Sequence, residues 1–352
     1  MSYEIGEVTE VLTPGRDAQA ELPRTQLSLT RVGVTGVEKV LRVSSSPAAP
    51  GREAEDAAGN GSDLYYATLE CFVDLNPRQA GVHMSRFEEV FNEAIDEVVL
   101  GEAFKAETLA AHIAARVRER QDGMRAEVTI EARYPETVPA PASGLLTQEL
   151  YTLYGTAVSS EHGARTLTGV QAQGMTACPC AQGLVSDRAR ERLAAKGLEP
   201  ALIDDVLETV PIATHNQRGI GRLYLGLPEG SEAVIDASDL VRIVEQSMSS
   251  EIYELMKRSD ELSVVEKAHA RPRFVEDCVR EMVRRVVEAY PELDDDGFVC
   301  ARQESLETIH RHNVVAERTG LVSEIRAEIA SGEHSRHHLT MREWLEAPAA
   351  GA

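Results

Sequence analysis

Residues 124–132 read MRAEVTIEA, and this stretch decides the fold class. Apolar side chains stand at every second position, with charged or hydroxyl side chains between them: Met124, Ala126, Val128, Ile130 and Ala132 alternate with Arg125, Glu127, Thr129 and Glu131. Because successive side chains of a strand point to opposite faces, the pattern predicts a half-buried β-strand. A strand with one polar face is typical of an antiparallel sheet.

The segments around this strand predict both strands and helices in the first half of the chain. We expect strands over residues 26–43, 64–75, 147–158 and 164–176, and helices over residues 85–100 and 104–120. In the helix over 85–100, apolar residues recur with helical period, and Ser85 with Glu88 can form a capping box. Prolines at 135, 139 and 141 are expected to interrupt the chain before the next strand.

The second half predicts helices over residues 185–196, 200–209, 237–257 and 273–290, strands over 220–227 and 296–302, and then an acidic tail. Antiparallel strands carrying helix pairs, twice over, predict an α+β fold of two related modules. We place a flexible N-terminal arm at residues 1–25 and a first module at 26–160, with a loop insertion at 44–62. A second module follows at 161–330, and a C-terminal tail at 331–352.

Composition excludes several classes of protein. The 352 residues include 36 Lys and Arg against 58 Asp and Glu, which gives a net charge of −22. A protein that binds a nucleic-acid backbone needs a basic face, so this acidic chain is not expected to bind nucleic acid. The sequence has no run of about 18 apolar residues that would span a membrane, and its start does not resemble a signal peptide. Five cysteines, an odd and sparse set, favour a reduced, cytoplasmic protein.

The strongest chemical signal is the pair of thiols in residues 176–182, TACPCAQ. Proline between Cys178 and Cys180 fixes the backbone, so the two side chains hold a set direction. A thiolate here could bind a metal ion or act in catalysis. The alternative is a pair of small buried residues.

Two further polar segments could bind anions or transfer protons. His215 and Arg218 lie in THNQRG (214–219), where a histidine can act as general acid or metal ligand and an arginine can hold phosphate. His83 and Arg86 lie in DLNPRQAGVHMSRF (74–87), where a strand gives way to the start of a helix, a place suited to anions. An ordinary polar loop and a well-capped helix are the alternatives.

Three acidic or imidazole side chains lie in the last third of the chain. Glu276 falls off the apolar stripe of its helix, so local evidence alone favours a solvated helix face. Glu307 and His310 are spaced i, i+3, which can aim two ligands at one metal ion but also occurs on exposed elements.

Taken together, these segments resemble the type IB GTP cyclohydrolases, including their archaeal branch. The resemblance spans residues 27–315 and rests on seven stretches in one order: VGVTGVEK (32–39), DLNPRQAGVHMSRF (74–87), GMTACPCAQ (174–182), THNQRG (214–219), KRSDE (257–261), RPRFVEDCVR (271–280) and ETIHRHN (307–313). It implies a tunnelling fold (T-fold) of two tandem modules, assembled into homodimers or homotetramers with sites at interfaces. It also implies GTP as substrate and a divalent metal, Fe2+, Mn2+ or Zn2+, as cofactor.

The resemblance also implies a role for each candidate residue. Cys178 matches a metal-associated thiolate, Cys180 a second catalytic thiol, and His215 a proton donor to N7 of guanine that also contacts the metal. Glu276 matches the guanine anchor. Glu261, Glu307 and His310 match positions linked to the metal, while Arg218, His83 and Arg86 are candidates for the triphosphate.

The implied reaction opens the imidazole ring of GTP, releases formate and forms 7,8-dihydroneopterin triphosphate, the first step of tetrahydrofolate synthesis. About 35 residues separate Cys180 from His215, a longer connection than the short bacterial enzymes have, so the archaeal product, a 2′,3′-cyclic phosphate, is the alternative. The Glu-rich composition and the 44–62 insertion fit a bacterial protein, which favours the triphosphate. A queuosine-pathway reductase and a non-catalytic nucleotide- or metal-binding module are the remaining alternatives.

Overall fold

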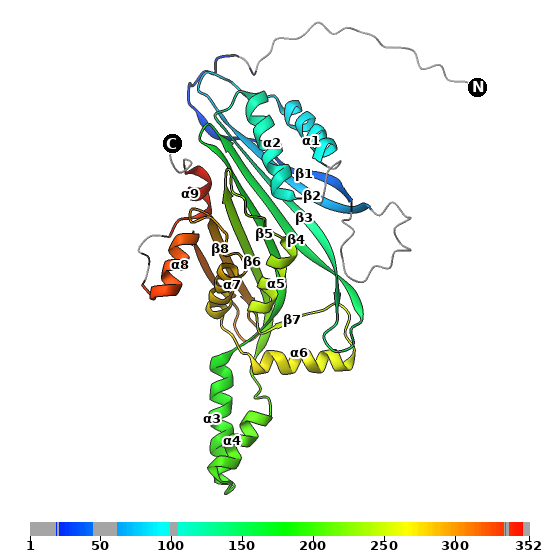
Figure 1. Ribbon diagram of the computed structural model, residues 1–352, viewed down its shortest axis with the longest axis vertical. Helices are drawn as coiled ribbons and strands as arrows, with labels where there is room; N and C mark the ends of the chain where they lie inside the picture. The colour runs from blue at the N-terminus through cyan, green and yellow to red at the C-terminus, as the bar shows by residue number, and fades with distance from the viewer. Residues whose placement is uncertain are drawn as a thin grey trace, which may run out of the picture.

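One antiparallel sheet runs through the molecule, and its strand order nearly repeats the order of the chain (Figure 1). The computed structural model describes residues 19, 21–44, 62–98, 105–333, 335 and 338–347. The strands are β1 (Leu29–Ser44), β2 (Ser62–Leu75), β3 (Arg125–Pro139), β4 (Leu146–Ser160), β5 (Gly163–Ala177), β6 (Asn216–Pro228), β7 (Ser250–Glu251), β8 (Phe298–Leu306) and β9 (Val314–Leu321). They are arranged β1-β2-β3-β4-β5-β6-β8-β9, and the short β7 pairs with the end of β5.

Two pairs of helices cover one face of the sheet. The helices are α1 (Met84–Val98), α2 (Ala106–Gln121), α3 (Pro179–Ala195), α4 (Pro200–Thr209), α5 (Ala237–Ser247), α6 (Arg258–Ala270), α7 (Val275–Ala289), α8 (Val322–Ser331) and α9 (Met341–Glu346). Helices α1 and α2 pack on β1–β4, and α5 and α7 pack on β5–β9. The start of α2 lies so close to β4 that a Cβ on Gly155 would meet the Ala106 backbone at 2.2 Å, which explains the glycine there.

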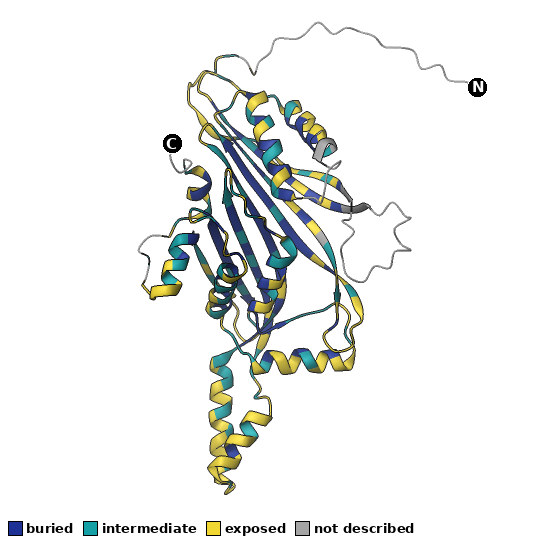
Figure 2. Cartoon of the chain, in the orientation of Figure 1, coloured by how far each residue is buried: buried dark blue, intermediate teal, exposed yellow. Residues whose placement is uncertain are grey.

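Each helix pair closes its own apolar core against the sheet (Figure 2). A smaller cluster on the opposite face holds Trp344 of α9, which stacks on Phe298 with ring centroids 5.5 Å apart. Among the described residues, no helix is both long and apolar enough to cross a membrane.

The long strands separate two ends of the molecule. Arg125 pairs with Ser160, and Ser160 with Gly163, so β3 starts where β4 ends and β5 starts. Strand β5 then runs 15 residues to Ala177, which pairs with Asn216 at the start of β6. At about 3.3 Å per residue, the two ends lie roughly 45 Å apart. We refer to the end that holds Ala177 and Asn216 as the Ala177 end.

The predicted α+β class with a large antiparallel sheet is confirmed, and most predicted elements of the first half are present. Strand β3, however, continues through Pro135 to Pro139, whereas an interruption was expected. The predicted insertion at 44–62 falls almost entirely outside the described residues, as does most of the predicted arm at 1–25. The division into two modules stays a prediction.

Two expectations for the second half are wrong. The single helix over 237–257 is not formed, because α5 ends at Ser247, β7 then joins the sheet, and α6 is a separate helix. Likewise, the strand near 296–302 is not followed directly by a tail. Strand β9 and helix α8 come next, and α9 forms within the segment assigned to the tail.

Candidate active site at the Ala177 end of the sheet

Pairing of β5 with β6 brings the two polar motifs side by side. Beyond the last pair, Ala177 with Asn216, the Cys178 N–H donates to the His215 carbonyl oxygen at 3.1 Å. The Thr214 hydroxyl donates to the Cys178 carbonyl oxygen at 2.7 Å. Antiparallel register therefore joins CPC and HNQR, which lie about 35 residues apart in sequence.

Cys178 is the N-cap of α3. Its Sγ accepts a hydrogen bond from the Ala181 N–H at 3.4 Å, and Pro179 takes the first helical position, where no N–H is needed. Cys180 is exposed in the same first turn, and both thiols are free. The motif thus places one half-buried and one exposed sulfur at the Ala177 end.

A hydrogen-bonded chain links His215 to Glu307 through Gln217. His215 Nδ1 lies 2.9 Å from Gln217 Oε1, and Gln217 Nε2 donates to Glu307 Oε1 at 3.2 Å. Because an amide oxygen only accepts, the first contact requires the proton on Nδ1. Nε2 of His215 is then the nitrogen left to bind a metal ion or exchange a proton.

Glu307 carries an oxygen without a hydrogen-bond partner. Its side chain is 7 % exposed, and Oε2 lies 3.8 Å from His215 Nδ1. Within the described part of the chain, Oε2 is a buried atom that receives no hydrogen bond. A buried charged oxygen of this kind is costly unless a cation or a donor contacts it.

The chemistry of these side chains suits a divalent metal ion, but too few of them converge to hold one. Thiolate, imidazole and carboxylate are ligand types of Zn2+ and Fe2+, and Mn2+ accepts the last two. In the described ranges, however, no three His, Cys, Asp or Glu side chains converge closely enough to hold a metal ion. A single chain offers the pair His215 and Glu307, with Cys178 on the adjoining strand end.

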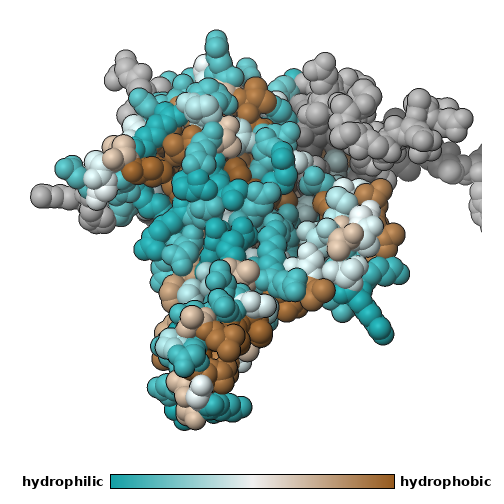
Figure 3. All heavy atoms as spheres, turned by 60° about the horizontal axis from the view of Figure 1, so that its bottom comes forward, coloured by the Kyte–Doolittle hydropathy of each residue, from teal (hydrophilic) through white to brown (hydrophobic). Residues whose placement is uncertain are grey.

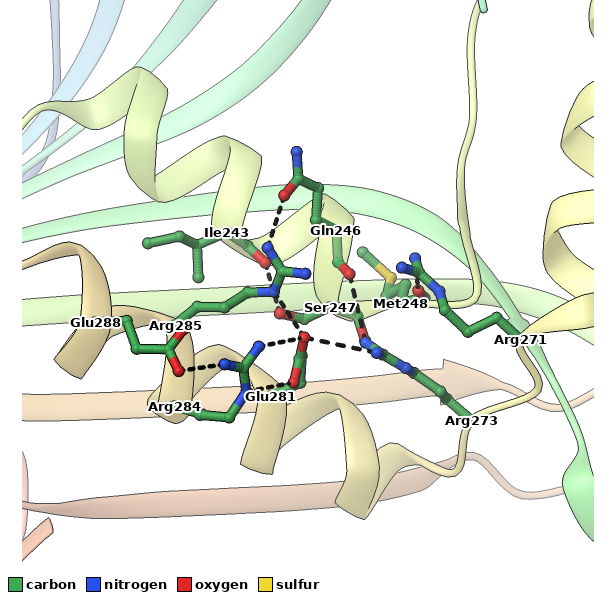
Figure 4. A network of polar contacts seen from close by, with 10 residues as sticks. All are labelled: Ile243, Gln246, Ser247, Met248, Arg271, Arg273, Glu281, Arg284, Arg285 and Glu288. Carbon is green, nitrogen blue, oxygen red and sulfur yellow. Dashed lines mark hydrogen bonds and ion pairs between the residues drawn. The ribbon is translucent and has the colours of Figure 1, made fainter. Parts of the chain in front are cut away.

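The start of α7 is fixed beside the Cys178 segment by Arg273, whose side chain lies against the end of α5 (Figure 4). The Arg273 backbone N–H donates to the Ala177 carbonyl oxygen at 3.0 Å, and Nη1 donates to the Ser247 carbonyl oxygen at 2.8 Å. Glu276 follows three residues later, exposed in the first turn of α7. Arg273 therefore joins β5, the end of α5 and the helix that carries the predicted guanine anchor.

An ionic network holds the rest of this junction. The Arg271 side chain donates to the carbonyl oxygen of Met248 at 2.7 Å, and Met248 is the residue directly after α5. Within α7, Glu281 accepts hydrogen bonds from Arg284 and Arg285 (Figure 4). These bonds, those of Arg284 most of all, lower the pKa of Glu281 to about 2. Glu281 is therefore charged at neutral pH.

Arg218 and His310 lie near this centre but do not join it. Arg218 follows Gln217 in β6, and strand alternation turns it to the opposite face of the sheet. His310 is exposed after the end of β8 and stacks on His312, with ring centroids 5.2 Å apart.

Glu261 lies farther away on α6. The carboxyl end of α6 reaches the site region, where Gln182 of α3 donates to the His269 carbonyl oxygen at 2.7 Å. Glu261 is eight residues earlier, roughly 12 Å along the helix axis, and is exposed. Its neighbour Asp260 is the buried carboxylate and accepts hydrogen bonds from Ser143 in the β3–β4 connection.

His83 and Arg86 lie at the other end of the molecule. The His83 carbonyl oxygen accepts from Gln121 at the end of α2, and Arg86 donates to the Arg120 carbonyl oxygen. These residues adjoin the start of β3, roughly 45 Å from Cys178. Within one chain they do not contribute to the same site.

Sequence reasoning missed Gln182, Gln217 and Arg273. Gln217 stands inside the quoted HNQR motif, and its position on the buried face of β6 follows from strand alternation. Gln182 follows Cys178 by four residues, which places both on one side of α3. No local signal marks Arg273, because its partners lie 26 and 96 residues away.

A sequence profile of the family described as type I GTP cyclohydrolase folE2 matches residues 16–316. The chain belongs to the GTP cyclohydrolase family. It is 39 % identical over 319 residues to GTP cyclohydrolase MptA of Methanococcus aeolicus, covering 89 % of this chain and 99 % of the relative. It is 38 % identical over 322 residues to GTP cyclohydrolase MptA of Methanocaldococcus jannaschii, covering 90 % and 98 %.

This GTP cyclohydrolase family member also resembles a solved structure in fold. Uricase from Arthrobacter globiformis matches with a TM-score of 0.50 and 10 % identity, over 88 % of this chain and 96 % of that one. At that identity the likeness concerns the fold alone. It is consistent with the expected tunnelling fold.

Proposed function

We propose that this chain is a metal-dependent enzyme that opens the imidazole ring of GTP, releases carbon 8 as formate and forms 7,8-dihydroneopterin triphosphate. The observation that carries the proposal is the junction at the Ala177 end. There Cys178, His215 and the partnerless oxygen of Glu307 adjoin the start of α7, which bears Glu276.

The side chains divide the work by chemistry. Protonated on both ring nitrogens, with Nδ1 bonded to Gln217, His215 donates its Nε2 proton to N7 of guanine as water attacks carbon 8. Glu276 accepts hydrogen bonds from the ring N–H and the exocyclic amine of guanine, a pair that adenine does not present. The exposed thiol of Cys180 faces the substrate as the second catalytic sulfur.

Cys178 and Glu307 are the side chains that would hold the metal, with Glu261 and His310 as less favourably placed candidates. His215 would be either a ligand or the proton donor, because its one available nitrogen cannot do both. The metal, Fe2+, Mn2+ or Zn2+, supplies a bound water of lowered pKa. Glu276 and Cys180 are exposed, so both side chains are open to the substrate.

A second product has its own support. The MptA relatives come from methanogens and are covered over nearly their whole length. That likeness supports 7,8-dihydroneopterin 2′,3′-cyclic phosphate as the alternative product. The match to the folE2 profile supports the triphosphate.

The deciding experiment is anaerobic turnover of GTP by metal-stripped protein resupplied separately with Fe2+, Mn2+ or Zn2+. Formate is quantified, and the pterin is identified by mass spectrometry. We expect formate with at least one metal, in equal amount to a triphosphorylated pterin. A cyclic phosphate would select the alternative product, and tight GTP binding without formate under all three metals would contradict the proposed reaction.

A further inference from the structure

The α3–α4 hairpin, residues 179–209, projects from the Ala177 end and is joined to the body of the molecule at its base (Figure 1). Figure 3, which brings this end forward, shows the hairpin standing away from the rest of the surface. Helix α3 has no buried residue, and the ion pairs of Arg188 with Glu191 and of Arg190 with Asp204 stay inside the hairpin. Packing along the length of α3 therefore contributes little to fixing its first turn.

One side chain, that of Gln182, ties this first turn to the body. Its Nε2 donates to the Ile212 carbonyl oxygen at 3.2 Å and to the His269 carbonyl oxygen at 2.7 Å. The NH2 group of an amide carries two hydrogens, so these two bonds use both of them. Among the described residues, Gln182 is the one member of α3 whose side chain hydrogen-bonds outside the hairpin.

The two carbonyl groups belong to separate segments of the site region. Ile212 lies three residues before His215, in the stretch that leads into β6. His269 lies in the last turn of α6, where carbonyl groups lack partners within the helix. The Arg273 N–H, four residues later, is bonded to the Ala177 carbonyl oxygen instead. One amide therefore holds together α3, the end of α6 and the approach to His215.

The same turn carries both thiols of the site. Cys178 is its N-cap, and Cys180 is its second residue. The Gln182 backbone N–H donates to the Cys178 carbonyl oxygen at 3.2 Å, and that oxygen also accepts from the Thr214 hydroxyl at 2.7 Å. A movement of Gln182 would therefore shift Cys178 directly and Cys180 through the turn that they share.

We propose that Gln182 is a positioning residue, whose side-chain amide keeps the thiols of Cys178 and Cys180 beside His215. The inference rests on the proposed function only in that these thiols serve the reaction. Because Gln182 acts through the thiols, its loss slows the chemical step. Recognition of guanine is left intact, since it depends on Glu276 of α7, and the hydrogen bonds of Gln182 go to other segments.

The first test measures the thiols without substrate. Gln182→Met keeps the length of the side chain and removes both donors, and Gln173→Met makes the same change at an exposed position of β5. Alkylation of Cys178 and Cys180 by iodoacetamide is followed by peptide mass spectrometry with the same added metal throughout, and hydrogen exchange is followed in residues 178–186. We expect Gln182→Met to speed alkylation of Cys178 and exchange in this segment by about ten-fold, the scale of one or two lost hydrogen bonds, while Gln173→Met matches the original protein. Equal rates in Gln182→Met and the original would overturn the proposal.

The second test separates the hydrogen bonds of Gln182 from the shape of its side chain. Gln182→Lys restores a donor at this position, so we expect it to slow alkylation of Cys178 again relative to Gln182→Met. Alkylation equally fast in both variants would assign the effect to shape and overturn the proposal.

Steady-state formate release then links the thiols to turnover. We expect Gln182→Met to lower kcat by about ten-fold with KM for GTP unchanged, because the lost interactions affect the reacting groups and not the base anchor. A raised KM with unchanged kcat would overturn the positioning role. Absence of formate from every protein, the original included, would contradict the proposed function, and the alkylation rates would still decide the role of Gln182.

Discussion

Glu276 is exposed at the start of α7, where a ligand can reach its carboxylate. We expect Glu276→Gln to leave the melting temperature unchanged but to lower kcat/KM for GTP by about 10- to 100-fold, since hydrogen bonds to a charged group are worth about 1.5–3 kcal/mol. Glu288→Gln, an exposed change on the same helix, is the control for steady-state formate release. Equal effects of the two changes would contradict a guanine-binding role.

Glu245 is a partly buried carboxylate on α5. Burial, above all, raises its pKa to about 7, although the Tyr151 hydroxyl donates to Oε1 at 2.9 Å. The folded state thus holds a proton that the unfolded chain releases near pH 4.5, so ionisation destabilises the fold progressively between about pH 4.5 and 7. We expect Glu245→Gln to stabilise the protein by up to about 3 kcal/mol at pH 8 and little at pH 4.5. Urea unfolding at both pH values measures this.

Glu281 provides the opposite case on the neighbouring helix. Its pKa is lowered to about 2, first by Arg284 and then by Arg285, so its stabilising charge is complete above about pH 4.5 and is lost as the pH falls toward 2. Glu281→Gln is therefore expected to destabilise the protein at pH 8. If both variants destabilised the protein at pH 8, the assignment for Glu245 would be wrong.

At the scale of elements, Arg273 is the residue that ties three of them together. Arg273→Ala removes the side-chain bonds to the end of α5 and frees the start of α7, so we expect KM for GTP to rise more than kcat falls. Arg273→Lys retains the charge but not the forked geometry, and we expect it to recover part of the loss. Arg280→Ala, which lies on the same helix and pairs with Asp277, is the control. A change in melting temperature with unchanged KM would indicate a purely structural role.

Elements set by local periodicity could be read from the sequence, whereas those set by distant contacts could not. The alternation in residues 124–132 predicts β3 correctly, because whether each side chain there is apolar or polar depends only on which face of the sheet it lies on. Helix α5 ends at Ser247 because Arg271 and Arg273, more than 20 residues later, take its last carbonyl groups. No pattern within residues 237–257 contains that information.

The site shows the same division. The two motifs that meet at Ala177 are both recognisable in the sequence, since thiols and a histidine in polar segments are common catalytic and metal-binding residues. Their distance from His83 depends instead on the length of β5 and on the order of strands between them. Sequence spacing cannot supply that distance, because 95 residues separate His83 from Cys178 without fixing a direction.

At the scale of the whole molecule, charge should govern capture of the substrate. A net charge of −22 repels a nucleotide triphosphate at long range, and salt screens that repulsion. We expect kcat/KM for GTP to stay level or to rise between roughly 0.01 and 0.15 M ionic strength, where the screening length falls from about 30 to 8 Å. The measurement is initial formate release at low GTP with an inert salt. A steep fall in rate over this range would show that a local basic surface outweighs the net charge.

The near-identity of strand order and chain order has a consequence for how the protein is made. Each strand from β2 to β6 pairs with the strand synthesised just before it, so the sheet can grow by one hairpin at a time as the chain leaves the ribosome. The first helix pair and its core are complete by about residue 160, long before the second half exists. Until β5 arrives, β4 presents an open hydrogen-bonding edge. Slow translation beyond residue 160 would therefore expose that edge longest and favour aggregation of the nascent chain.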